Sequence, residues 1–133
     1  MTGPTIRLLP LALLLAAACG ADETGPSAPP AMAADVSIVR GASLLTTGAF
    51  DPNPKVVRLA DGGEVRWVNG DGGSSYGGGA PTAHQIASDD GAFPTSNPFR
   101  PGETYSITLR AAGTYHYHCA IHPNMVGTIT VGP

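Results

Sequence analysis

Glycine and proline recur throughout this chain and limit what it can fold into. The 133 residues include 18 glycines and 13 prolines, and both residue types interrupt helices. No stretch of convincing length has helical periodicity. Short apolar runs lie between turn-forming residues instead, a pattern typical of short strands joined by tight turns. The sequence therefore predicts an all-β domain.

Alternating residues indicate where the strands lie. Between residues 113 and 119, Tyr117 and Cys119 fall on one face of an extended chain, and His116 and His118 fall on the other. The expected strands are residues 36–39, 55–59, 64–68, 82–88, 104–110, 113–119 and 127–131.

The connections between these strands favour antiparallel pairing. Residues 61–63 (Asp-Gly-Gly) separate two expected strands and are typical of a hairpin turn. Residues 41–54 fit either one turn of helix or a further strand. Several short strands with turn signals between them predict an antiparallel β-sandwich or barrel.

Charge and cysteine content exclude some classes of protein. The net charge is −3, with ten acidic and seven basic residues. No basic patch is available to neutralise phosphates, so we expect no nucleic-acid partner. Two cysteines are too few for a disulfide-stapled mini-protein. The length suits one modest domain.

Residues 1–18 have the features of a signal peptide. Arg7 supplies a positive charge, and the apolar run 8–18 follows it. That run is shorter than the about 20 apolar residues that a spanning helix needs. Small residues and Cys19 end it, as in a bacterial lipoprotein, so we expect Cys19 to be lipidated. The alternative is ordinary cleavage nearby, with Cys19 removed.

The chain after Cys19 divides into a linker and a domain. Residues 19–34 are rich in Gly, Pro, Ala and acids, and we expect a flexible tether. Residues 35–133 form the expected domain. Within it, residues 69–81 contain six glycines in thirteen positions. We interpret them as a flexible insertion; the alternative is a flap near the site that follows.

Four residues are candidate metal ligands. Cys119, His122 and Met125 stand three residues apart in one loop between two expected strands, and His84 lies upstream on another strand. Two imidazoles, a thiolate and a weak thioether are the ligand set of a blue-copper electron-transfer site.

Other interpretations of these residues are less complete. Zinc usually has further cysteines or a carboxylate, and the domain has no second thiol. A Cys/His nucleophilic dyad leaves Met125 without a role. Taken singly, Cys119 is also compatible with a buried inert thiol, Met125 with core packing, and His84 and His122 with ordinary strand and loop histidines.

The segment 113–131, GTYHYHCAIHPNMVGTITV, resembles the C-terminal signature of the cupredoxins. Its Cys-x-x-His-x-x-Met spacing is most similar to that of the amicyanin group. The resemblance implies an eight-stranded Greek-key β-sandwich that binds one type 1 copper per chain. It also implies that His84, Cys119, His122 and Met125 are the ligands. The family usually has an asparagine after the first histidine, and Gln85 stands there instead.

The resemblance further implies a function and its partners. We expect an electron carrier rather than an enzyme. We also expect a monomer that docks transiently with redox proteins through the rim around His122. With the N-terminal features, it predicts an exported, periplasmic or cell-surface lipoprotein, held at the membrane through Cys19.

Two other classes of function remain open. One is a copper-delivery lipoprotein that has the same ligands and no redox partner. The other is an enzyme, either a small copper oxidase or a Cys/His hydrolase. We interpret His116 and His118 as partly exposed strand histidines, with a second metal site as the alternative.

Overall fold

The computed structural model describes residues 34–73 and 80–133. The expected signal peptide, the expected lipidation site Cys19 and the expected linker as far as residue 33 lie outside the described residues, as do residues 74–79 of the glycine-rich segment. In the part that is described, no helix is both long enough and apolar enough to cross a bilayer.

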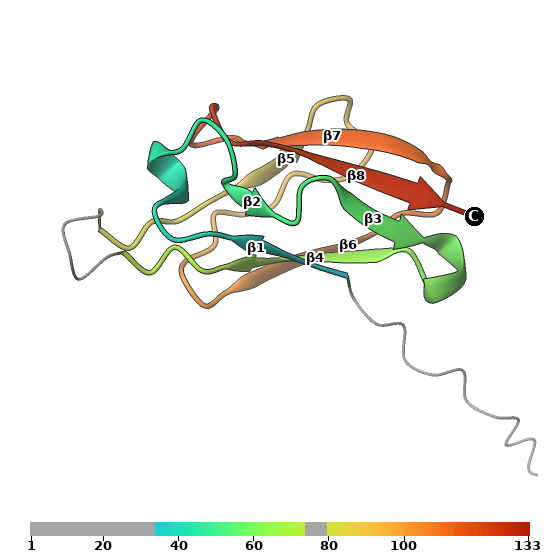
Figure 1. Ribbon diagram of the computed structural model, residues 1–133, viewed down its shortest axis with the longest axis horizontal. Helices are drawn as coiled ribbons and strands as arrows, with labels where there is room; N and C mark the ends of the chain where they lie inside the picture. The colour runs from blue at the N-terminus through green and yellow to red at the C-terminus, as the bar shows by residue number, and fades with distance from the viewer. Residues whose placement is uncertain (1–33, 74–79) are drawn as a thin grey trace, which may run out of the picture.

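In the described residues, the domain contains eight strands and two short 3₁₀ helices (Figure 1). In chain order they are β1 (Ala34–Ile38), η1 (Ala42–Leu44), β2 (Phe50–Asp51), β3 (Lys55–Arg58), η2 (Leu59–Asp61), β4 (Glu64–Asn69), β5 (Ile86–Ser88), β6 (Thr104–Thr108), β7 (Gly113–Cys119) and β8 (Val126–Gly132). The all-β prediction is confirmed. The ambiguous residues 41–54 hold both a helical turn, η1, and a strand, β2.

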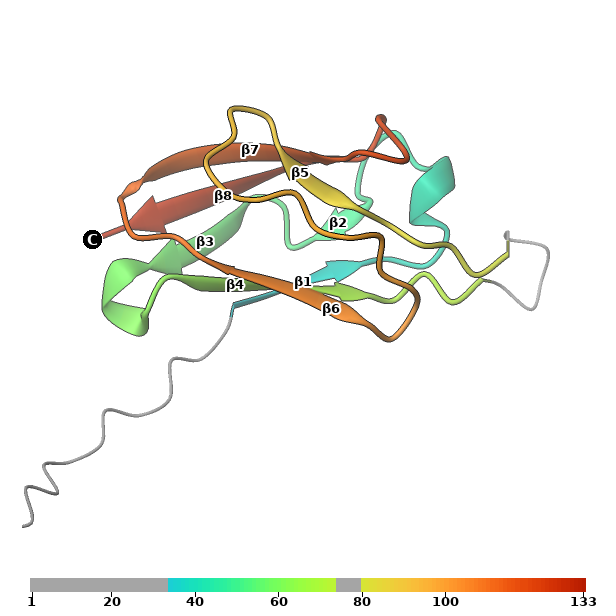
Figure 2. The same ribbon diagram turned by 180° about the vertical axis from the view of Figure 1, so that it is seen from behind.

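The strands form two four-stranded sheets that face each other as a sandwich (Figure 2). One sheet has the order β2-β1-β4-β6 and the other β3-β8-β7-β5. Two neighbouring pairs, β1 with β4 and β3 with β8, are parallel. The sandwich is as expected, but these two pairs depart from the expected antiparallel pairing, because chain crossovers between the sheets bring their strands side by side in the same direction.

The predicted hairpin at residues 61–63 was also wrong. Strands β3 and β4 belong to different sheets, and η2 carries the chain between them. Gly62 and Gly63 have positive φ angles of 94° and 66°, and the Gly63 carbonyl accepts a hydrogen bond from the Leu109 N–H at 2.9 Å. The turn therefore docks against the chain after β6 instead of closing a hairpin.

The core lies between the sheets and has aromatic side chains at its centre. Trp67 is fully buried and contacts Tyr117 edge-on, with ring centroids 5.1 Å apart. It also stacks on Tyr105 at 5.6 Å. Tyr117 and Cys119 both point into the core from β7, as the alternation predicted. Because β7 is anchored in this core, Cys119 is held firmly at the end of the strand.

Candidate metal centre

The β7–β8 loop folds back on itself directly after Cys119. The Cys119 N–H donates to the Met125 carbonyl at 3.0 Å, and the Met125 N–H donates to the His122 carbonyl at 3.0 Å. These two bonds make the loop compact. The spacing of three residues therefore brings a thiol, an imidazole and a thioether into one short, well-fixed segment.

A second segment contributes His84 from the other side. Residues 82–88 were expected to form a strand, but only Ile86–Ser88 pairs as β5. His84 instead forms an isolated bridge with Phe99, with N···O distances of 3.0 and 2.9 Å. The Ala120 N–H donates to the Gln85 carbonyl at 2.8 Å, which joins this segment to the cysteine loop.

The structure brings three of the four expected ligands together. Sγ of Cys119 lies 3.7 Å from Nδ1 of His84 and 3.6 Å from Nδ1 of His122. The three ligand atoms all lie within 4.8 Å of one another. The two imidazole rings are 5.0 Å apart between centroids and inclined at 60°.

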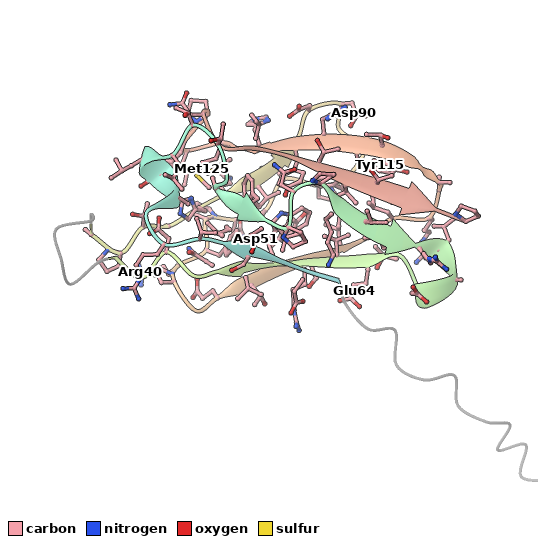
Figure 3. All side chains as sticks on the ribbon, viewed as in Figure 1. Arg40, Asp51, Glu64, Asp90, Tyr115 and Met125 are labelled. Atoms are coloured by element: carbon pink, nitrogen blue, oxygen red, sulfur yellow. The ribbon has the colours of Figure 1, made fainter. Side chains whose placement is uncertain are left out.

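The four expected ligands differ in their exposure. His84, Cys119 and Met125 are fully buried, whereas His122 is partly exposed. Figure 3 shows Met125 near the end of the molecule where the β7–β8 loop lies, away from Glu64 and Tyr115. The site is therefore closed on its inner side and reaches solvent through His122.

Hydrogen bonds favour the thiolate form of Cys119. Burial acts to raise the pKa of this thiol, but the hydrogen bonds from His84 and from the Gln85 N–H outweigh it and lower the pKa from 9.0 to about 6. The Gln85 N–H lies 3.5 Å from Sγ. For His84, burial acts to lower the pKa, while contacts with Cys119 and Asp71 raise it overall. A metal needs the thiolate, so this environment prepares a ligand.

Gln85 joins the two segments by its backbone. Its N–H contacts Sγ of Cys119 and its carbonyl accepts from Ala120. Its side-chain amide turns away and donates to the Ser96 carbonyl at 2.9 Å. Gln85 therefore joins the two segments through its main chain and not through its side chain.

Sequence reasoning missed Asp71, which lies behind His84. The Asp71 carboxylate is buried, and its Oδ2 atom is 3.0 Å from Nε2 of His84. Asn69 is also buried and donates to the Thr82 and Phe99 carbonyls, each at 3.0 Å. A metal-binding imidazole usually donates its second ring N–H to a carboxylate or carbonyl. The sequence signal for such a partner was the Asn-Gly-Asp segment at 69–71, upstream of His84.

His116 and His118 are directed away from this cluster. Nδ1 of His118 lies 2.6 Å from an Asp89 carboxylate oxygen, and Nδ1 of His116 lies 3.2 Å from the Thr128 hydroxyl. Their side chains lie on the outer face of β7, as the alternation predicted. Within the described segments, the group of His84, Cys119 and His122 is the one cluster of at least three ligand side chains close enough for one metal ion.

The donor set fits copper. A buried thiol poised as thiolate and two imidazole Nδ1 atoms form the soft and intermediate ligands that copper prefers, with a buried thioether in the same loop. A structural zinc site would need a fourth strong ligand, and the cluster contains three such side chains.

Comparison with known proteins agrees with this chemistry. Residues 43–132 match the sequence model of the family described as copper binding proteins, plastocyanin/azurin family. The chain belongs to this family. It is 34% identical over 110 residues to the chloroplastic plastocyanin of Chlamydomonas reinhardtii, covering 74% of this chain and 68% of that protein.

Solved structures show the same cupredoxin fold. A purple cupredoxin from Nitrosopumilus maritimus superposes with a TM-score of 0.61 at 26% identity, over 74% of this chain and 99% of that one. A reduced mutant of amicyanin gives a TM-score of 0.56 at 23% identity, over 75% and 82% of the two chains. This cupredoxin is therefore a copper-binding electron carrier and not an enzyme.

Proposed function

We propose that this cupredoxin is an exported blue copper protein that carries single electrons between redox partners. We assign His84, Cys119, His122 and Met125 as its ligands. The observation that carries the assignment is the approach of three ligand atoms to within 4.8 Å from two separate segments. Bound copper supplies a one-electron couple between Cu(II) and Cu(I).

The protein contributes a site that changes little during electron transfer. Backbone hydrogen bonds hold the loop around Cys119 and join it to Gln85. The Gln85 N–H also donates to the sulfur, and such outer contacts tune a copper site. Because both segments are tied to the core, the ligands stay close to one geometry in both oxidation states.

Electrons enter and leave through the rim around His122 in this proposal. His122 is the partly exposed ligand, and Ile121 beside it is 44% exposed. Pro123 and Asn124 are exposed as well. A small, weakly charged rim suits a transient encounter, which buries a modest area.

The first experiment titrates the domain with copper(II) while the visible spectrum is recorded. We expect an intense blue thiolate-to-copper band that saturates at one copper per chain. The control is Cys119→Ser, which keeps a similar side chain but removes the thiolate, and it should abolish the band. A colourless wild-type complex would refute the type 1 site.

The same preparations separate a carrier from a copper-delivery protein. A carrier keeps its copper against a competing chelator and exchanges electrons quickly between its Cu(I) and Cu(II) forms, which NMR line broadening measures. Ile121→Asn should leave the blue band in place and slow this self-exchange several-fold. Labile copper with slow exchange would contradict the carrier role and favour delivery.

Export and anchoring complete the proposal. Residues 1–18 support a signal peptide, and Cys19 supports a lipid anchor. A tether between that anchor and the domain would let the rim around His122 reach partners near a membrane surface.

A further inference from the structure

Asp71 has its carboxylate in the protein interior, where few carboxylates are found. The residue is 1% exposed. Its Oδ2 atom lies 3.0 Å from Nε2 of His84, and its Oδ1 atom accepts the Gly41 N–H at 2.7 Å. Burying a charge costs free energy unless partners replace its water. Both oxygens have such a partner.

The main chain also holds Asp71 in place. Its N–H donates to the Asn69 side-chain oxygen at 2.9 Å, and its carbonyl accepts the Thr82 N–H at 3.1 Å. In the described part of the chain, Asp71 has no ion pair with a lysine or arginine, and its contact with His84 is its one charge-related pair. The carboxylate is therefore directed at the candidate metal ligand.

We propose that Asp71 is a positioning residue of the copper centre that also biases it toward Cu(II). Its carboxylate accepts the Nε2–H of His84, which leaves Nδ1 of that ring free to bind the metal. This inference rests on the proposed function, because it takes His84 to be a copper ligand.

The geometry supports the positioning role. Nδ1 of His84 faces Sγ of Cys119 at 3.7 Å, while Nε2 faces Asp71 on the opposite side of the ring. A hydrogen bond at one ring nitrogen decides which nitrogen is free for a metal. Through Gly41, the same carboxylate also links the segment before η1 to the site.

The bias toward Cu(II) follows from charge. A buried negative group is poorly screened and stabilises a doubly charged ion more than a singly charged one. A carboxylate partner also raises the basicity of the imidazole, so that the ring donates its electron pair to the metal more strongly. Both effects favour the oxidised metal and lower the reduction potential.

The test is Asp71→Asn, which keeps the shape and removes the charge. An amide cannot accept from both His84 and Gly41 through separate oxygens, so one of these contacts is lost. The matched control is Asp89→Asn, because Asp89 also pairs with a histidine, His118, outside the proposed ligand set.

We expect Asp71→Asn to weaken Cu(II) binding about 10- to 100-fold and Cu(I) binding less. For a one-electron couple, the reduction potential rises by about 59 mV for each tenfold by which the loss of Cu(II) affinity exceeds the loss of Cu(I) affinity. The control should keep both affinities and the potential. An Asp71→Asn protein with a wild-type or lower potential would overturn the inference.

A second readout uses wild-type protein alone. In the diamagnetic Cu(I) form, ¹H–¹⁵N NMR should show the His84 Nε2–H far downfield and slow to exchange with solvent. Its absence would overturn the inference even if Asp71→Asn failed to fold, and its presence would support it. A wild-type protein without the blue band would refute the proposed function itself. A blue wild type matched by Asp71→Asn in affinity and potential would refute this inference alone.

Discussion

At the scale of single residues, the thiol of Cys119 is subject to opposing effects. Burial disfavours a thiolate, and hydrogen bonds from His84 and the Gln85 N–H favour it. The hydrogen bonds dominate, because the sulfur accepts donors both from its own loop and from the segment that carries His84 and Gln85. The thiol is therefore prepared for metal binding before a metal arrives.

This balance predicts how the metal-free protein responds to pH. Thiolate absorbance near 240 nm should appear with a midpoint near pH 6, well below the 9.0 of an ordinary thiol. Because the folded-state pKa of Cys119 is lowered, its thiolate adds to the free energy of unfolding of the metal-free protein. This contribution is complete above about pH 9 and is lost as the pH falls through about 6.

Cys119→Ser is the reference for that titration, since it removes the thiolate signal and the associated slope of stability against pH. A midpoint close to 9 in the wild type would contradict the assigned environment. Unfolding by denaturant at pH 5 and pH 8, compared between the two proteins, measures the same linkage independently.

At the scale of elements, the pairing of β7 with β8 depends on a glycine. Gly127 lies opposite Tyr117, and a Cβ atom at Gly127 would overlap the Cζ and Oη atoms of the Tyr117 ring. Tyr117 is fully buried against Trp67 and stands two residues before Cys119. The absent side chain therefore leaves room for a core aromatic that supports the metal loop.

Gly127→Ala should lower the free energy of unfolding by about 1–3 kcal/mol, the usual range for overpacking a core. Denaturant unfolding of the metal-free protein measures the change. The matched control is Gly132→Ala on the same strand, where an added Cβ would come no closer than 4.0 Å to the Val57 carbonyl oxygen. The control should change stability by less than about 1 kcal/mol. Equal effects at both positions would contradict this account of Gly127.

At the scale of the whole molecule, the site lies where separate segments meet. Asp71 follows β4, His84 precedes β5, and the other proposed ligands come from the end of β7 and the loop that follows it. Gly41 reaches the same place from the chain after β1. Each segment is fixed to a sheet of the sandwich, so the site inherits the stability of the entire fold.

The proposed anchor is also tested on the whole chain. Expressed from residue 1 in a bacterium that processes lipoproteins, the wild type should enter the membrane fraction and carry an acyl mass on Cys19. Cys19→Ala should lose both properties and keep the same blue band. An unmodified wild-type chain found only in the soluble fraction would contradict the anchor.

Much of the domain was predictable because its signals are local. Alternation along residues 113–119 predicted which side chains face the core, since successive residues of a strand point in opposite directions. Short strands bounded by glycine and proline indicated the all-β class. The proximity of Cys119 and His122 was predictable for the same reason, since they lie three residues apart.

Only the tertiary structure decided which strands pair and what surrounds the ligands. The sequence signal at residues 61–63 indicated a turn correctly but could not indicate that the chain changes sheets there. Asp71 reaches His84 across 13 positions and Gly41 across 30. Alternation reports the face on which a side chain lies, but not its neighbour across the core. That neighbour depends on how distant segments pack, and at this site it is the carboxylate behind the first histidine.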